Sequence, residues 1–237
     1  MDNNIRKMQL KVLGIFSKAA KTFALAGGTA LELFYLKHRF SKDLDFFSPN
    51  YTIKEIENIV SQIKSGLKLE VKFENEFIAT GHARVRFYTV GSKKTRTKLK
   101  IDFVEDVFFE SPVIRKFNDI PVYDVKNIYT QKVFAIAGTY TAKNGFGKEI
   151  ATGRNEARDV FDVYILSKQV KPLNVFIKNL PRVQQRGLIQ WWRSFSRLDL
   201  KIGVMDLDIY RKKFDVSEML NHLDDEIKKF IGEEIEI

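Results

Sequence analysis

The sequence contains no cysteine, which excludes disulfides, thiolate metal ligands and cysteine nucleophiles and agrees with a reducing compartment. The three histidines, His38, His82 and His222, stand far apart, so a histidine-rich zinc site is not expected. No apolar run approaches the roughly 20 residues that cross a bilayer. The first residues also lack the basic and apolar segments of a signal peptide. We therefore expect a cytoplasmic protein with no membrane partner.

Positive charge is in excess. Lys and Arg number 40 and Asp and Glu number 30, so the formal net charge is +10. A charge of this size favours polyanionic partners such as nucleotides or nucleic acid, although a generally lysine-rich proteome would produce the same balance. The length of 237 residues and the apolar content of 44% allow one large domain or two small ones.

The hydrophobic pattern predicts an α+β fold with two parts. Helical periodicity covers 5–23, 30–36 and 52–63, while short apolar or alternating runs predict strands over 23–26, 43–47, 82–90, 97–104 and 120–122. From about residue 125 the pattern is helical, over 125–140, 155–167, 172–179, 183–196 and 216–231. We predict an α/β domain over 1–124 and a helical bundle over 125–237. Four glycines within 138–153 predict a long flexible loop.

A pair of glycines follows the first predicted strand. Gly27 and Gly28 precede Thr29 and a helical stretch. Glycines between a strand and a helix let backbone amides point at a phosphate, close to the helix N-terminus. The Thr29 hydroxyl can add a further donor. The segment is therefore a candidate nucleotide-binding turn.

Two carboxylates follow on the next predicted strand, separated from Gly28 by fourteen residues. Asp43 and Asp45 stand at positions i and i+2, which project from one face of a strand. Asp102 lies on the polar face of a later, otherwise apolar strand, where a charge must be solvated, paired or bound to metal. Oxygen ligands of this kind suit Mg²⁺, and two ions about 4 Å apart stabilise phosphoryl transfer. The alternative is a set of ordinary surface carboxylates.

These segments resemble known motifs when taken together. The runs over 26–31 and 38–47 resemble the first motif of the AbiEii/AbiGii-type nucleotidyltransferase toxins, which belong to the polymerase-β-like superfamily. Residues 99–103 resemble the strand that carries the third carboxylate of that family, and 124–135 and 158–166 resemble its later lysine and Asp-x-x-Asp motifs. The resemblance covers roughly 23–166. It implies a nucleotidyltransferase α/β domain with a mixed sheet, followed by helices.

The resemblance also implies roles for single residues. Lys132 would contact nucleotide phosphates and Asp159 would be a further active-site acid, with Asp162 behind it on the same helical face. Arg39 would either contact phosphate or anchor the Asp-x-Asp strand, and Ser41 would shape the turn before it. The segment between Lys132 and Asp159 is longer than the family pattern, because of the glycine-rich stretch, which is either a disordered loop or a mobile lid.

The expected activity is transfer of a nucleoside monophosphate from an NTP to an acceptor hydroxyl with Mg²⁺. The family and the positive charge together imply an RNA acceptor, such as a tRNA 3′ end, and a toxin with a cognate antitoxin. Two alternatives stay open: a nucleotidyltransferase for small molecules or proteins, and a nucleic-acid-binding module without catalysis.

Two further segments invite a nucleic-acid interpretation. Lysines and arginines crowd one hairpin, at Lys93, Lys94, Arg96, Lys98 and Lys100 on one side and at Arg84 and Arg86 on the other. If Arg86 lies close to Asp102, this cationic face adjoins the metal site; otherwise it is a solubilising hairpin tip. The aromatic run at Trp191, Trp192 and Phe195 is either a stacking platform or a helix core with Arg186, Arg193 and Arg197 facing outward. The helical spacing favours the core.

Overall fold

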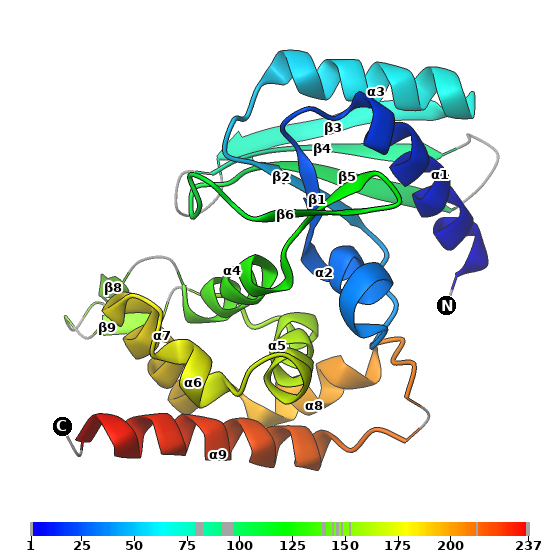
Figure 1. The fold of residues 1–237 in the computed structure, drawn as a ribbon. Coiled ribbons are helices and arrows are strands. Elements are labelled where there is room, and N and C mark those ends of the chain that lie inside the picture. The colour runs from blue at the N-terminus through cyan, green and yellow to red at the C-terminus, as the bar shows by residue number, and fades with distance from the viewer. Residues whose placement is uncertain are drawn as a thin grey trace. The chain divides into compact units, whose positions relative to one another are not determined.

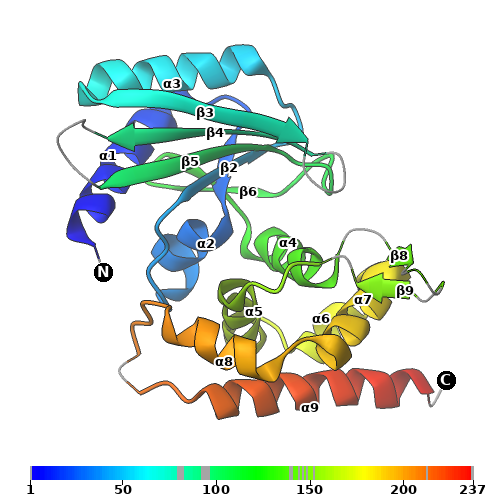
Figure 2. The ribbon, with the colours of Figure 1, turned by 180° about the vertical axis from the view of Figure 1, so that it is seen from behind.

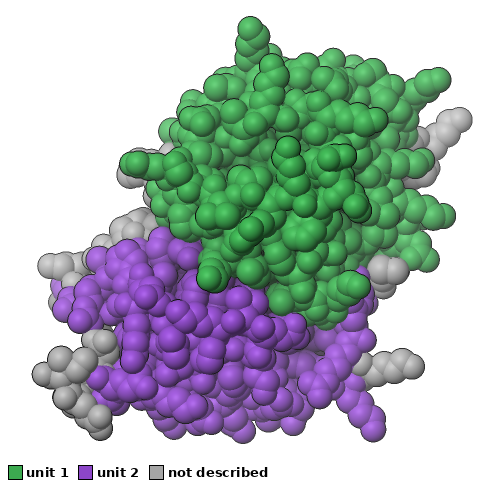
Figure 3. Space-filling view, viewed as in Figure 1, with its two compact units in different colours: residues 1–128 green, residues 129–237 purple. Residues whose placement is uncertain are grey.

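The computed structural model describes residues 2–78, 83–91, 97–138, 141–143, 145, 147, 149–151, 153–211 and 213–235. The chain divides into two compact units, Met1–Ile128 and Tyr129–Ile237, which Figure 3 shows in different colours. Helix α4 (Val125–Ala137) contains the boundary between them. The predicted division into domains over 1–124 and 125–237 concerns parts that fold independently, and it stays a prediction.

The described part of unit 1 is built on a mixed seven-stranded sheet in the order β3-β4-β5-β2-β1-β7-β6 (Figure 1). Strand β2 pairs in parallel with β5, and β1 pairs in parallel with β7, while the other neighbours are antiparallel. The strands are β1 (Ala24–Ala26), β2 (Leu44–Ser48), β3 (Glu70–Ile78), β4 (Arg84–Gly91), β5 (Lys98–Glu105), β6 (Ile114–Phe117) and β7 (Ile120–Tyr123).

Two amphipathic helices, α1 (Asn3–Ala19) and α3 (Ile53–Leu67), cover one face of this sheet (Figures 1 and 2). The Asp2 carboxylate caps α1 by accepting the backbone N–H of Asn4 at 2.8 Å and of Ile5 at 3.2 Å. Phe16 of α1 stacks on Phe46 of β2 with ring centroids 3.8 Å apart. The apolar stripe of each helix thus forms the core against the sheet.

Strand β5 confirms the alternation predicted from the sequence. Leu99, Ile101 and Phe103 are buried on the face that the helices cover, while Lys100 and Asp102 are only half-buried on the opposite face. Strand β2 begins at Leu44, so Asp43 is the residue that immediately precedes it. The open face of the sheet therefore carries Lys98, Lys100 and Asp102 of β5.

The described part of unit 2 is mainly helical, which together with the mixed sheet confirms the α+β prediction. Its helices after α4 are α5 (Ala157–Gln169), α6 (Leu173–Ile177), α7 (Arg182–Ser194), α8 (Arg197–Met205) and α9 (Val216–Ile235). Helix α4 ends at Ala137 because Gly138 takes a φ of 87°, and its N–H still bonds to the carbonyl of Phe134 at 2.8 Å.

The glycine-rich stretch is not a structureless loop, so that prediction is wrong. Strands β8 (Thr141–Lys143) and β9 (Glu149–Ala151) pair antiparallel within it, although several residues between and beside them lie outside the described part. The chain then returns to α4, where the Arg154 N–H donates to the carbonyl of Ala135 at 2.8 Å. A Cβ on Gly153 would lie 1.7 Å from the Ile136 carbonyl oxygen, so the return needs a glycine.

The aromatic run on α7 forms a core, as its helical spacing indicated. Trp191 and Trp192 are buried, and their indole N–H groups donate to Asn155 at 2.8 Å and Asp224 at 2.9 Å. Arg186 and Arg193 are exposed. Arg197 differs from the expectation of an outward-facing residue, because its guanidinium stacks 4.1 Å from the Trp192 ring. These tryptophans are therefore not free to stack on bases.

None of the helices in the described ranges combines the length and the apolar character that crossing a bilayer requires.

Candidate functional site

The two glycines after β1 make room for neighbouring polar side chains. Helix α2 (Gly27–Ala30) begins directly after the strand, with Gly27 at a φ of 66°. A Cβ on Gly27 would lie 2.2 Å from the Asp45 Oδ2 atom. A Cβ on Gly28 would lie 2.8 Å from both Arg39 Nη2 and Ser41 Oγ. The Gly-Gly pair therefore brings the backbone of this turn against Asp45, Arg39 and Ser41.

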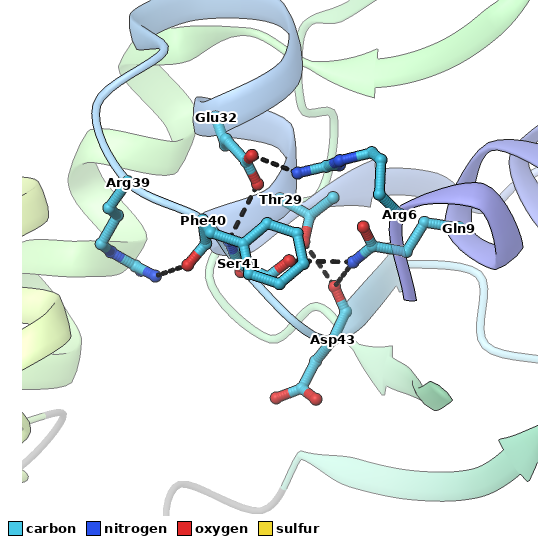
Figure 4. A network of polar contacts seen from close by, with 8 residues as sticks. All are labelled: Arg6, Gln9, Thr29, Glu32, Arg39, Phe40, Ser41 and Asp43. Atoms are coloured by element: carbon cyan, nitrogen blue, oxygen red, sulfur yellow. Dashed lines mark hydrogen bonds and ion pairs between the residues drawn. The ribbon is translucent and has the colours of Figure 1, made fainter. Parts of the chain in front are cut away.

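A polar network holds the segment that leads into β2 (Figure 4). Glu32, from the π-helical turn η1 (Leu31–Leu36), pairs with Arg6 of α1 and accepts the backbone N–H of Ser41 at 2.8 Å. Gln9 of α1 donates from Nε2 to the carbonyl of Ser41 at 2.9 Å. Because Glu32 and Gln9 are buried, each bond satisfies a group that would otherwise be destabilising.

The same network fixes the backbone of Asp43. Its carbonyl oxygen accepts from the Thr29 hydroxyl and, at 3.4 Å, from Gln9 Nε2. The Asp43 carboxylate points away from these contacts in Figure 4. In this arrangement the single proton of the Thr29 hydroxyl is used to position Asp43. Any contact from this turn to a phosphate would then come from backbone amides.

Arg39 and Ser41 lie inside this arrangement. Arg39 is 4% exposed, packs against Gly28 and donates from Nη1 to the carbonyl of Phe40 at 3.4 Å. The backbone of Ser41 bonds to both Glu32 and Gln9, and its hydroxyl faces Gly28. These are the contacts of residues that hold the turn in place.

Asp45 and Asp102 lie side by side on the open face of the sheet. Strands β2 and β5 are parallel, and their register places Asp45 opposite Asp102. Directly opposed residues project from the same face, and neighbouring strands are about 4.8 Å apart. Asp43 precedes Asp45 by two positions at the start of β2. The register thus places Asp45 and Asp102 side by side on one face of the sheet, while Asp43 lies just before β2.

The donor chemistry of these carboxylates suits a hard cation. Asp102 Oδ2 accepts from the Lys100 ammonium at 2.7 Å, so this carboxylate faces a positive charge within the chain itself. Among the described residues, no group of three or more His, Cys, Asp or Glu side chains is arranged to hold a metal ion. Asp45 and Asp102 provide the oxygen ligands that Mg²⁺ prefers, and Asp43 stands two positions before Asp45 in the sequence. The three carboxylates therefore fit Mg²⁺ by donor type, and Asp45 and Asp102 also share one face of the sheet.

The predicted approach of Arg86 to Asp102 is wrong. The β4–β5 register places Phe87 opposite Asp102 and Arg86 opposite Phe103, so Arg86 lies on the other face of the sheet. There its guanidinium pairs with Glu76 at 2.9 Å. Arg84 is bound to Glu105 at 2.9 Å. His82, Lys93, Lys94 and Arg96 lie outside the described residues.

Within unit 2, Lys132 stands in a buried ionic cluster. Its Nζ lies 2.6 Å from Asp159 Oδ1 and 2.8 Å from Asp162 Oδ2, and both carboxylates are 0% exposed. Arg154 Nε binds the second oxygen of Asp159 at 2.6 Å. Burial alone would raise the pKa of Asp159, but the charges of Lys132 and Arg154 outweigh it and hold this pKa below its usual value.

Sequence reasoning missed several of these residues. Glu32 could have been found, because it is a lone charge inside an apolar run. Gln9 and Arg6 carry no comparable signal, since they act through a contact between distant segments. Arg154 and the direct bond of Asp162 to Lys132 are likewise visible only in the folded chain.

Gly27→Ala should impair both folding and any chemistry at Asp45. The added methyl group would collide with the Asp45 carboxylate and would sit on a residue with positive φ. We expect a loss of about 1–3 kcal/mol in the free energy of unfolding, measured by urea denaturation. Gly14→Ala is the matched control, because nothing lies within 4 Å of a Cβ there. Equal stability of Gly27→Ala and the wild type would contradict this packing.

Comparisons with known proteins identify the family and the fold. The family model described as "Nucleotidyl transferase AbiEii toxin, Type IV TA system" matches residues 13–233. A crystal structure described as that of a "putative nucleotidyltransferase from H. pylori" aligns with a TM-score of 0.60 at 18% identity over 98% of both chains. The structure of JHP933 from Helicobacter pylori aligns with a TM-score of 0.57 at 19% identity, over 98% of this chain and 94% of that one. A search of curated protein sequences finds no match. Both structures share the fold, and the family match spans most of the chain, so this protein belongs to the AbiEii nucleotidyltransferase toxin family.

Proposed function

We propose that the chain transfers a nucleoside monophosphate from an NTP to a hydroxyl group of RNA, releasing pyrophosphate. The observation that carries this proposal is the pairing of Asp45 with Asp102 on adjacent parallel strands, with Asp45 packed against Gly27. The family supports nucleotidyl transfer, and the net charge of +10 supports a polyanionic acceptor. A tRNA 3′ end is the acceptor that we consider first.

Each residue of the site has a proposed task. Asp43, Asp45 and Asp102 would hold a pair of Mg²⁺ ions, and one of these carboxylates would accept the proton of the attacking hydroxyl. Bound there, Mg²⁺ would neutralise charge on the triphosphate and on the leaving pyrophosphate. The amides of Gly27 and Gly28 would hold phosphate oxygens, while Thr29, Arg39 and Ser41 keep the turn in position.

Lys132 and Asp159 have proposed roles in the same reaction. Lys132 would contact nucleotide phosphates, and Asp159 would orient its ammonium group through the 2.6 Å ion pair. Two buried carboxylates already neutralise Lys132, so Asp159 and Asp162 would determine how much of its charge reaches a phosphate.

The family assignment suggests a biological role as well. We propose that nucleotide transfer to RNA inhibits growth in the cytoplasm, and that a cognate antitoxin, the second component of a type IV system, counteracts it. The family match is the observation that supports this part of the proposal.

The test is incubation of the purified protein with each α-³²P-labelled NTP, Mg²⁺ and total RNA, followed by gel analysis. Label in RNA, lost with EDTA, is the expected result. Label in protein or in small molecules would favour the alternative acceptors. Failure to bind Mg²⁺–NTP by calorimetry, with RNA binding retained, would instead favour a non-catalytic nucleic-acid-binding module.

A further inference from the structure

The open face of the sheet continues past the carboxylates as a row of paired residues. The registers place Asp45 of β2 opposite Asp102 of β5, and Asp102 opposite Phe87 of β4. Phe77 of β3, two positions beyond the partner of Phe87, projects from the same face. Since neighbouring strands are about 4.8 Å apart, Phe87 lies roughly 5 Å from Asp102 and 10 Å from Asp45 across the sheet.

Phe87 and Phe77 form an aromatic pair on this face. Their ring centroids are 6.3 Å apart at an interplanar angle of 71°. Phe87 is partly exposed, and Phe77 is 45% exposed on the edge strand of the sheet. Large aromatic rings left open beside carboxylates present a π-face to any planar group that approaches.

Two lysines of β5 lie on the same face as this aromatic pair. The Lys100 ammonium lies 5.2 Å from the Phe87 centroid and binds Asp102, while Lys98 projects exposed from the same face of β5. Carboxylates share the area: Glu74 accepts from Thr89 at 2.6 Å and from Lys72 at 2.6 Å, and Asp102 lies opposite Phe87. Lysines and carboxylates are thus paired beside the rings, while the Lys98 side chain is exposed.

We propose that this surface, formed by Phe77, Phe87, Lys98 and Lys100 and here called the aromatic–lysine platform, binds the single-stranded end of the RNA acceptor. The inference rests on the proposed function and specifies its substrate. Exposed rings on a sheet stack unpaired bases, and the neighbouring lysines bind phosphates. A base stacked on Phe87 would keep its ribose within one or two strand spacings of the carboxylates. A duplex offers no such face, because its bases are stacked internally.

RNA binding without NTP tests the platform directly. Fluorescence anisotropy of a labelled single-stranded oligonucleotide should show that Phe87→Ala and Phe77→Ala bind about 10-fold to 100-fold more weakly than wild type. Phe87→Trp should retain binding, since it keeps a stacking ring. The matched control is Phe73→Ala, which removes an equally exposed phenylalanine from the opposite face of the same strand, where Arg86 lies 5.3 Å from its ring.

Several outcomes would overturn the proposal. One is unchanged affinity for single-stranded RNA in both Phe87→Ala and Phe77→Ala. Another is a loss of affinity in Phe73→Ala as large as in these two variants, and a third is that Phe87→Ala and Phe77→Ala lose as much affinity for blunt duplex RNA as for single-stranded RNA.

Gel filtration that shows a wild-type dimer lost in Phe77→Ala would assign the surface to a second copy of the chain. In turnover, the KM for RNA should rise in Phe87→Ala while the KM for NTP stays the same. Stacking-dependent binding without any transfer would reject the proposed function and retain the platform.

Discussion

Asp45→Asn should lower nucleotide transfer by at least about 10²-fold to 10³-fold while the protein stays folded. Asp45 packs on Gly27 and lies opposite Asp102, so its carboxylate contacts the glycine turn and also faces the β2–β5 pair. Asparagine keeps its shape but removes the charge that holds a cation, and metal-assisted charge stabilisation contributes several kcal/mol. Each 1.36 kcal/mol corresponds to a tenfold change in rate.

Single-turnover incorporation of labelled NMP, with circular dichroism on the same sample, measures this effect. Asp119→Asn is the matched control: it removes the same charge from an exposed turn of unit 1, at a φ of 64° that asparagine tolerates well. Its activity should equal that of the wild type. A folded Asp45→Asn variant with more than a tenth of wild-type transfer would remove Asp45 from the catalytic set.

Lys132→Met should have the largest effect on stability, a loss of about 3–5 kcal/mol in the free energy of unfolding. Methionine matches the length of the lysine stem but leaves Asp159 and Asp162 without the ammonium that lies 2.6 and 2.8 Å from them. Breaking a buried ion pair from one side leaves a charge that neither water nor a partner stabilises. Arg154 still binds Asp159 and partly neutralises its charge, so the substitution should affect the charge of Asp162 more than that of Asp159.

Urea denaturation measures this loss, with Lys168→Met as the control. Lys168 forms an exposed pair with Glu218 at 3.7 Å, and such pairs contribute less than about 1 kcal/mol. The lowered pKa of Asp159 gives a second readout. A carboxyl group whose pKa is lower in the folded chain than its unfolded value of about 3.9 stabilises the folded state at pH values above that unfolded pKa. This stabilisation is lost as the pH falls through the folded-state pKa. Lys132→Met should weaken that acid dependence, and an unchanged denaturation midpoint would show that the cluster does not stabilise unit 2.

Much of the fold follows from local pattern. The alternation along 97–104 predicts which residues of β5 are buried, and helical periodicity predicts α1 and α3. Strand β3 was not predicted, since a bulge between Phe73 and Asn75 interrupts its alternation and most of its residues are exposed. Helix α8 was missed as well, because its exposed apolar residues Leu198, Ile202 and Met205 obscure its buried face.

Local sequence patterns likewise indicated some features of the candidate site and not others. The spacing of Gly27, Gly28, Asp43 and Asp45 along the chain already indicated a phosphate turn beside paired carboxylates, because strand geometry and glycine chemistry act over a few residues. No local pattern predicted that the Asp45 carboxylate would occupy the space that a Cβ on Gly27 would fill. Nor did one predict that Glu32 and Gln9 would hold the segment before Asp43.

By itself, then, the sequence indicated the family, the α+β class and the candidate residues for the chemistry. Tertiary structure alone decided their neighbours: Phe87 rather than Arg86 beside Asp102, and Asp162 as well as Asp159 on Lys132. The physical reason is that strand register and burial depend on contacts between distant segments. A shift of one residue moves every side chain of a strand to the other face, so a correct list of residues still leaves open which of them meet.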